Sequence, residues 1–562
     1  MSDSDSVSAD FSVGGTSAHR PTLMGTQHMV VAGHYGAAHA AFTILEAGGN
    51  AVDAGVAAGI ALGVLQCDIV NVAGVAPIIL REAKTGQVQT IAGLGRWPRL
   101  ADPERFRREN GGHIPDGLLR TVVPAAPDAW ITALKRFGTM SFGEVAQPAI
   151  RFADSFPMYP LLAGMIQLHE AEYRRWGSNA AIYLPGGHAP KIGTIFRQAD
   201  LARTLRYMVD EEKAKGRHEG AHYAFYKGDI ARAITAYHET NGGWMRMDDM
   251  AGYSSDVAPA VTRIWNGVEV STCGPWCQGP VLLQALSLLE PHRVEQLGHN
   301  SLAYLHLLAE ALKLAFADRE RYYGDPRFVD VPLDLLLSEQ YATGRRKLIH
   351  SDKAWITAAP LTALPQLPRD TSYVCVIDRH GNAFSATPSD VSFDSEVIPG
   401  TGLAPSSRGS QSWCDPAHKS VLAPGKRPRL TPNPALAVKP GEWVMPFGTP
   451  GGDVQCQAML QVLLNIALFD MAPQDAVEAP RLATYSFPDS FEPHQEIPGR
   501  LNVESRVSPE ILDGLRAKGH DLVQWPDWTW RAGAVCAIVA DQKTGVLSGG
   551  ADPRRPSYAV GW

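Results

Sequence analysis

The chain is 562 residues long, 45% hydrophobic and 19% charged, and carries a formal net charge of -7. That length is enough for several domain-sized units with a large buried core. The mild acidity, and a sequence without long Lys/Arg runs, argue against a nucleic-acid-binding protein. The seven cysteines are odd in number and widely spaced, so no disulfide framework is indicated and a cytoplasmic location is expected.

Residues 1–25 are predicted to form a disordered tail, because they are rich in Ser, Asp and Gly and lack the basic and apolar regions of a secretory signal. A strand over 29–32, a helix over 37–47, the turn Gly48-Gly49-Asn50 and a helix from Val52 are then predicted. The apolar stretch 51–70 is interrupted by polar residues, which favours a buried helix over a membrane span. Further helices are predicted over 125–137, 142–153, 229–238 and 302–316.

A change of composition divides the chain near residue 370. Residues 357–370 hold three prolines without periodicity, which predicts an extended, accessible linker. The segments 372–378 and 383–387 then predict a β-hairpin whose first strand is covered on both faces. Strands over 436–438, 443–447 and 534–539 and a helix over 457–469 complete a layered α/β pattern.

The pentapeptide His218-Glu219-Gly220-Ala221-His222 matches the H-E-x-x-H pattern of zinc peptidases. That pattern requires a continuous helix, but glycines stand at 216 and 220, and residues 223–228 resemble the end of a loop. We therefore predict a solvated loop and no metal site.

Thr371 opens the predicted hairpin directly after the proline-rich segment. Threonine is a strand former, so packing alone could account for it. However, Ser389 follows the hairpin and Gly451-Gly452 stand downstream. If the chain were cut between Asp370 and Thr371, the freed α-amine, with a pKa of about 7.7–8.0, would lie within reach of Oγ as a general base. The two glycines could bring backbone N–H groups to a reacting carbonyl, although residue type alone favours an ordinary tight turn.

Ordered motifs along nearly the whole chain carry a resemblance to a known family. They are 48–54 (GGNAVDA), 147–150 (QPAI), 225–228 (FYKG), 317–319 (ADR), 324–326 (GDP), 370–371 (DT), 378–382 (DRHGN), 400–402 (GTG), 424–428 (PGKRP), 450–452 (PGG) and 552–554 (DPR). With these motifs the chain resembles the gamma-glutamyltransferase family of N-terminal-nucleophile hydrolases.

The resemblance implies a four-layer αββα sandwich made as a proenzyme, which cleaves itself into a large subunit (26–370 after the tail) and a small subunit (371–562). By this resemblance Thr371 is the nucleophile, Ser389 supports it, and Gly451 and Gly452 form the oxyanion hole. The two subunits stay associated, and homodimerisation of that heterodimer is left open. The implied partners are a small-molecule amide and a water or amine acceptor, without a cofactor, a metal, nucleic acid or a membrane.

The sequence departs from the family where the glutamate α-amine is held. Residues 406–413 read SSRGSQSW, so neutral Gln411 replaces a carboxylate and Arg408 enters, which suits an anion better than an ammonium. The family's paired serines fall on Leu430 and Thr431, and its carboxylate-binding arginine falls about two positions from Arg96. The glycine-rich stretch 71–77 is also altered, which favours a repacked core turn over a change of specificity.

In this segment the chain resembles a divergent branch of the family that includes amidohydrolases and acylases. Three hypotheses stay open. The first is a self-processing amidase for an acyl group that carries a carboxylate but no α-amine, bound by Arg96, Arg408, Gln411 and Thr431. The second is a true gamma-glutamyl hydrolase or transferase. The third is an uncleaved binding protein with the same fold.

Overall fold

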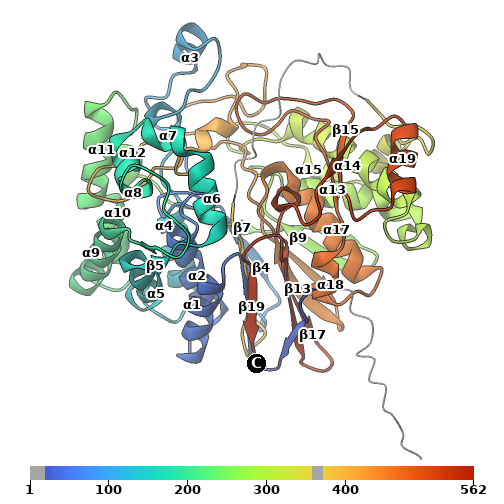
Figure 1. Ribbon diagram of the computed structural model, residues 1–562, viewed down its shortest axis with the longest axis horizontal. Helices are drawn as coiled ribbons and strands as arrows, with labels where there is room; N and C mark the ends of the chain where they lie inside the picture. The colour runs from blue at the N-terminus through green and yellow to red at the C-terminus, as the bar shows by residue number, and fades with distance from the viewer. Residues whose placement is uncertain (1–18, 357–370) are drawn as a thin grey trace, which may run out of the picture.

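The computed structural model describes residues 19–356 and 371–562. Two antiparallel seven-stranded sheets pack face to face, and each is covered on its outer side by helices (Figure 1). This is the predicted four-layer αββα sandwich. The predicted linker and Asp370 lie outside the described residues, as do residues 1–18.

The first sheet has the strand order β1-β18-β17-β13-β12-β9-β8. Its bounds are Leu23–Gly25, Leu547–Ala551, Cys536–Asp541, Trp443–Gly448, Ala435–Lys439, Val268–Thr272 and Val261–Trp265. Helices α13 (Gly279–Leu289), α17 (Gln455–Ala467) and α18 (Pro473–Glu478) cover its outer face, and α14 (Leu302–Tyr322) packs on α13.

The second sheet has the strand order β19-β2-β10-β11-β3-β4-β7. Its bounds are Tyr558–Gly561, Met29–Ala32, Val374–Ile377, Ala383–Ala386, Ile78–Arg81, Val88–Ile91 and Val257–Pro259. Helices α1 (Tyr35–Glu46) and α2 (Ala51–Leu65) cover it. Every residue of α2 is buried, which explains why this helix is apolar all round, and a capping box of Asn50 and Asp53 starts it.

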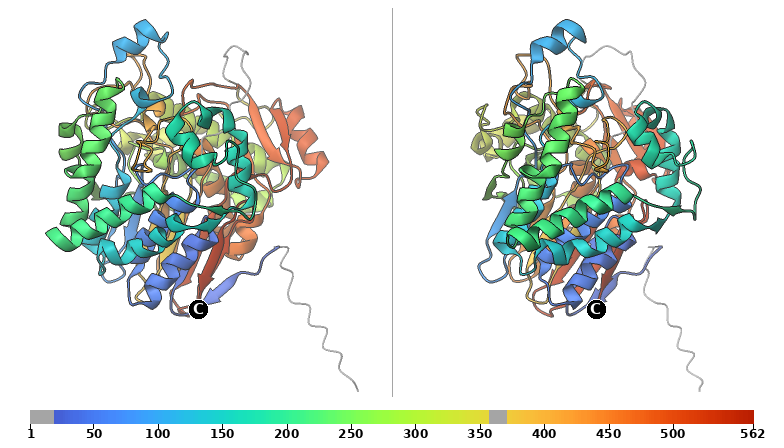
Figure 2. Two further views of the ribbon diagram at one scale, coloured as in Figure 1. Left: turned by 60° about the vertical axis from the view of Figure 1, so that its left-hand side comes forward. Right: turned by 90° about the vertical axis from the view of Figure 1, so that its left-hand side faces the viewer.

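A further group of helices lies outside α1 and α2, and the right-hand view of Figure 2 shows its green and teal ribbons across that side. They include α4 (Ala126–Phe137), α5 (Phe142–Asp154), α9 (Ala199–Lys215), α10 (Glu219–Tyr226) and α11 (Asp229–Thr240). The predicted loop over 218–228 is therefore wrong, because α10 occupies most of it. A Cβ on Gly220 would lie 2.1 Å from the Glu211 carbonyl oxygen, so this glycine permits close packing of α10 on α9 rather than breaking the helix.

The remaining elements are shorter or peripheral. The helices are α3 (Pro103–Glu109), α6 (Pro160–Leu168), α7 (Glu170–Arg174), α8 (Gly177–Tyr183), α12 (Met247–Ala251), α15 (Leu333–Leu336), α16 (Glu339–Arg346) and α19 (Pro509–Ala517). Two small sheets consist of β14 (Leu482–Thr484), β15 (Arg500–Glu504) and β16 (Asp521–Trp525), and of β5 (Phe156–Pro157) and β6 (Ile195–Phe196).

The hairpin β10–β11 lies in the middle of the second sheet. Val374 and Val376 face the helical layer, while Tyr373, Cys375 and Ile377 face the first sheet, so β10 is buried on both faces as predicted. This strand places Thr371, two residues before Tyr373, in the interior of the sandwich.

The other predicted strands and helices are confirmed to within a few residues, except that α14 continues past residue 316 to Tyr322 and that the start of the described chain differs. Leu23–Gly25 belongs to the predicted tail but forms β1, because it pairs with β18 and becomes the edge strand of the first sheet. Within the described residues, no helix combines the length and apolarity needed to span a bilayer.

Candidate active site

The predicted nucleophile and its predicted support meet in the interior. Thr371 Oγ1 lies 2.8 Å from Ser389 Oγ, and both side chains are fully buried. Gln455 Nε2 stands 3.5 Å from Thr371 Oγ1, at the outer limit of a hydrogen bond. The hairpin brings together two hydroxyls that are 18 residues apart in sequence.

The altered stretch 71–77 is hydrogen-bonded to the backbone of Ser389. Val75 N donates to the Ser389 carbonyl oxygen (3.1 Å), and Ser389 N donates to the Val75 carbonyl oxygen (3.0 Å). A Cβ on Gly74 would lie 2.3 Å from the Ser389 carbonyl oxygen and 2.8 Å from Asp390 Cβ. This core turn therefore sets the position of the Ser389 backbone, and only glycine fits beside it.

Arg408 contacts the pair of hydroxyls formed by Thr371 and Ser389. Its Nη2 donates to Ser389 Oγ, and its Nε lies 3.7 Å from Asp390 Oδ1. Asp390 also accepts hydrogen bonds from Ser406 Oγ (2.5 Å), Ser407 N (3.0 Å) and Ser407 Oγ (2.9 Å). Burial raises the pKa of Asp390 to about 6, although Arg408 opposes that rise. Asp390 was not predicted from the sequence. Its backbone sets it apart in the structure, because a φ angle of 140° is unusual for a residue other than glycine.

The predicted oxyanion glycines form a turn ahead of α17. Gly451 and Gly452 have φ angles of 122° and 56°, a backbone that favours glycine. Buried Gln278 fixes this turn, because its Nε2 donates to both the Gly452 carbonyl oxygen (2.9 Å) and the Thr431 carbonyl oxygen (2.8 Å).

Gln411 and Thr431, two of the predicted substrate-binding residues, contact each other. Gln411 Nε2 donates to Thr431 Oγ1 at 2.9 Å. Gln455 lies next to this pair through Asn433, whose N donates to Gln455 Oε1 at 3.1 Å. Sequence reasoning missed Gln278 and Gln455. A fully buried glutamine at the start of an apolar helix is the signal that could have found them.

Arg96 lies in a different cluster. Its Nη2 donates to the Ser254 carbonyl oxygen at 3.2 Å and lies 3.7 Å from Asp256, and its guanidinium stacks over Tyr253. These contacts join it to Tyr253, Ser254 and Asp256 and do not involve Thr371, so binding of a substrate carboxylate by Arg96 stays a prediction.

A cavity of about 270 Å³ adjoins the site. Asp453, next to Gly452, and Phe491, which lies under the Arg408 guanidinium at 5.3 Å, belong to its wall. The wall also includes the aromatic residues Tyr485, Phe487 and Trp525. The Asp453 carboxylate is already bonded to Arg319 and Ser490. The wall also carries the polar side chains of Asp489, Gln495, Arg500, Asn502, Gln524 and Arg531, so the cavity offers both aromatic faces and polar groups.

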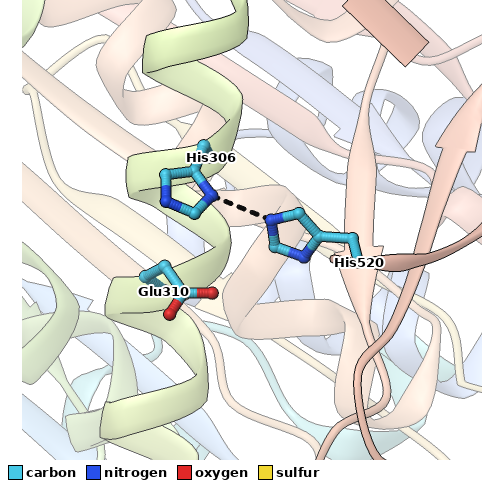
Figure 3. Close-up of side chains that lie close together, drawn as sticks. All are labelled: His306, Glu310 and His520. Carbon is cyan, nitrogen blue, oxygen red and sulfur yellow. Dashed lines mark hydrogen bonds between the residues drawn. The ribbon is translucent and has the colours of Figure 1, made fainter. Parts of the chain in front are cut away.

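Two groups carry residues of the kind that bind metals. In the first, His218 Nε2 contacts the Met140 carbonyl oxygen and His222 Nε2 contacts Asp128. The second, the histidine cluster, consists of His306, Glu310 and His520, whose candidate ligand atoms lie within 4.8 Å of one another (Figure 3).

The histidine cluster contains its own cation. His306 Nδ1 lies 2.9 Å from His520 Nε2, while Lys313 Nζ donates to Glu310 (2.8 Å) and lies 3.4 Å from His520 Nδ1. Glu310 also accepts from Trp355 N at 2.8 Å. The cluster thus connects α14 and His520 to the segment before residue 357.

Comparison with known proteins agrees with this architecture. A family model described as gamma-glutamyltranspeptidase matches residues 37–562. The glutathione hydrolase-like YwrD proenzyme of Bacillus subtilis is 32% identical over 96% of this chain and 99% of its own length. The acylase ACY 1 proenzyme of Pseudomonas sp. strain SE83 is 33% identical over 94% and 92%, respectively. The crystal structure of cephalosporin acylase from Bacillus halodurans, 29% identical, superposes with a TM-score of 0.87 and covers 100% of this chain and 99% of its own. The chain belongs to the gamma-glutamyltranspeptidase family of N-terminal-nucleophile hydrolases.

Proposed function

We propose that this protein is a self-processing amidohydrolase whose nucleophile is Thr371. The observation that carries the proposal is the buried 2.8 Å contact between Thr371 Oγ1 and Ser389 Oγ. Thr371 is the residue that directly follows the proposed cleavage point. The YwrD and ACY 1 relatives are both named as proenzymes, which supports processing before activity.

Cleavage and turnover would use the same oxygen. Thr371 Oγ first attacks the Asp370 carbonyl carbon, and the peptide C–N bond breaks to give an ester and the free Thr371 α-amine. Water then hydrolyses the ester, which leaves a carboxylate on Asp370 and restores the Thr371 hydroxyl. In the mature enzyme the α-amine takes the hydroxyl proton as Oγ attacks a substrate amide, and it delivers that proton to the leaving amine. The Gly451 and Gly452 N–H groups would stabilise the oxyanion, and water then releases the acyl group.

The preferred substrate is an amide whose acyl group carries a carboxylate but no α-amine. The neutral Gln411–Thr431 pair supports this choice, because it offers no carboxylate for an ammonium group. The aromatic side chains in the wall of the cavity beside Asp453 would contact an apolar part of the substrate. A gamma-glutamyl hydrolase or transferase is the second candidate, favoured by the name of the YwrD relative.

The test compares glutaryl-p-nitroanilide with gamma-glutamyl-p-nitroanilide on wild type and Thr371→Ala. A higher kcat/KM for the glutaryl compound, lost in the variant, supports the preferred substrate. Preference for the gamma-glutamyl compound supports the second candidate. Equal p-nitroaniline release by Thr371→Ala would refute the proposed nucleophile, and a single uncleaved, inactive wild-type chain would favour a binding protein.

A further inference from the structure

The direction of one hydrogen bond defines the network around the nucleophile. A guanidinium has N–H donors and no acceptor, so Ser389 Oγ accepts from Arg408 Nη2. The Ser389 hydroxyl proton must therefore point away from Arg408, and Thr371 Oγ1 lies 2.8 Å from that oxygen. Thr371, Ser389 and Arg408 each have at most 2% of their surface exposed, so water screens this row of groups little.

Asp390 holds Arg408 in this row. Its carboxylate lies 3.7 Å from Arg408 Nε and is itself fixed by Ser406 and Ser407, the two residues that precede Arg408. Asp394, which is paired with Arg120, also acts electrostatically on this carboxylate. The carboxylate thus anchors both the guanidinium and the backbone that carries it.

We propose that Arg408 is a positioning residue that acts on the nucleophile through Ser389, and that Asp390 holds Arg408 in place. Arg408 polarises Ser389, whose hydroxyl donates to Thr371 Oγ1. As the α-amine removes the Thr371 proton, negative charge develops on Oγ1, and the donated hydrogen bond stabilises it. The same bond stabilises Oγ1 when it leaves during release of the acyl group. No proton passes to Arg408.

This inference rests on the proposed function, and it differs from a role of Arg408 in binding a substrate carboxylate. A carboxylate-binding arginine acts mainly on KM, because it contacts the substrate in the ground state and the transition state alike. An arginine that acts through Ser389 lowers kcat and also slows self-cleavage, in which no external substrate takes part. The two roles therefore predict different kinetics.

The test is a double-mutant cycle of Ser389→Ala and Arg408→Met, with Arg408→Lys as the conservative variant. Self-cleavage of the purified precursor is followed by denaturing gel, and kcat and KM are measured with glutaryl-p-nitroanilide. Each single variant should slow cleavage and lower kcat about 100-fold with KM within about threefold. The double variant should be no slower than Ser389→Ala alone, because Arg408 acts only through Ser389. Arg408→Lys should recover part of the loss.

Three results would overturn the inference. They are wild-type rates in Arg408→Met, a rise in KM with kcat and cleavage unchanged, and losses that multiply in the double variant. If Arg408→Met is insoluble, the uncharged polar variant Arg408→Gln replaces it in the cycle with the same criteria. A wild type that neither cleaves nor hydrolyses would instead refute the proposed function.

Discussion

Replacing Gly74 with alanine should inactivate the site by displacing the Ser389 backbone, although Gly74 itself contacts no reacting group. The new Cβ would stand 2.3 Å from the Ser389 carbonyl oxygen, whereas an ordinary contact begins near 3.4 Å. Ser389 must therefore move by about 1 Å, and misplacement of that size costs about 100-fold in rate. Overpacking at this buried turn should also cost about 1–3 kcal/mol of unfolding free energy.

The assay measures the self-cleavage rate of the precursor and kcat of the cleaved enzyme. Gly164→Ala is the matched control, because Gly164 lies exposed in α6 and a Cβ there meets nothing within 4 Å. We expect the control to behave like wild type. Cleavage and kcat of Gly74→Ala within threefold of wild type would refute the claim that this turn positions Ser389.

Three other predictions concern stability and metals. Arg319→Met leaves the buried Asp453 carboxylate without its ionic partner and should lower the unfolding free energy, measured by chemical denaturation, by about 3–5 kcal/mol. Arg321 is exposed, so Arg321→Met should change this free energy by less than about 0.5 kcal/mol, and equal effects of the two variants would contradict the prediction. Burial raises the pKa of Asp390 to about 6 despite Arg408, so the folded state binds more protons than the unfolded state between about pH 4 and 6. We therefore compare the unfolding free energies of wild type and Asp390→Asn. Their difference, wild type minus variant, should fall by up to about 3 kcal/mol as the pH rises through that range, and a difference that stays constant would contradict the raised pKa. Removal of metals with EDTA should leave hydrolysis unchanged, because Lys313 already supplies a cation to the histidine cluster; loss of activity restored by zinc would disprove this.

The sequence motifs predicted the fold and the centre of the site because those features are local or carried by the family pattern. The hairpin β10–β11 follows from its apolar strands and turn, and the motifs indicated that Thr371 and Ser389 belong together. The contact of Gln411 with Thr431 joins residues that the same motifs had assigned to one pocket.

The features that were missed depend on tertiary packing. Gln278 and Gln455 come from the starts of two different helices, and their spacing carries no sign of a common site. Gly220 suggested a helix break, because a glycine chosen for close packing looks the same in sequence as one that ends a helix. The contact of Arg408 with Ser389 depends on a buried carboxylate, Asp390, whose role becomes visible only in three dimensions.

The most direct test of the account is the intact mass and N-terminal sequence of purified wild type and Thr371→Ala. We predict that wild type separates into chains of residues 1–370 and 371–562, the second beginning with Thr371, while the variant stays a single chain. A wild type that remains intact, or one that is cut elsewhere, would contradict the N-terminal threonine mechanism.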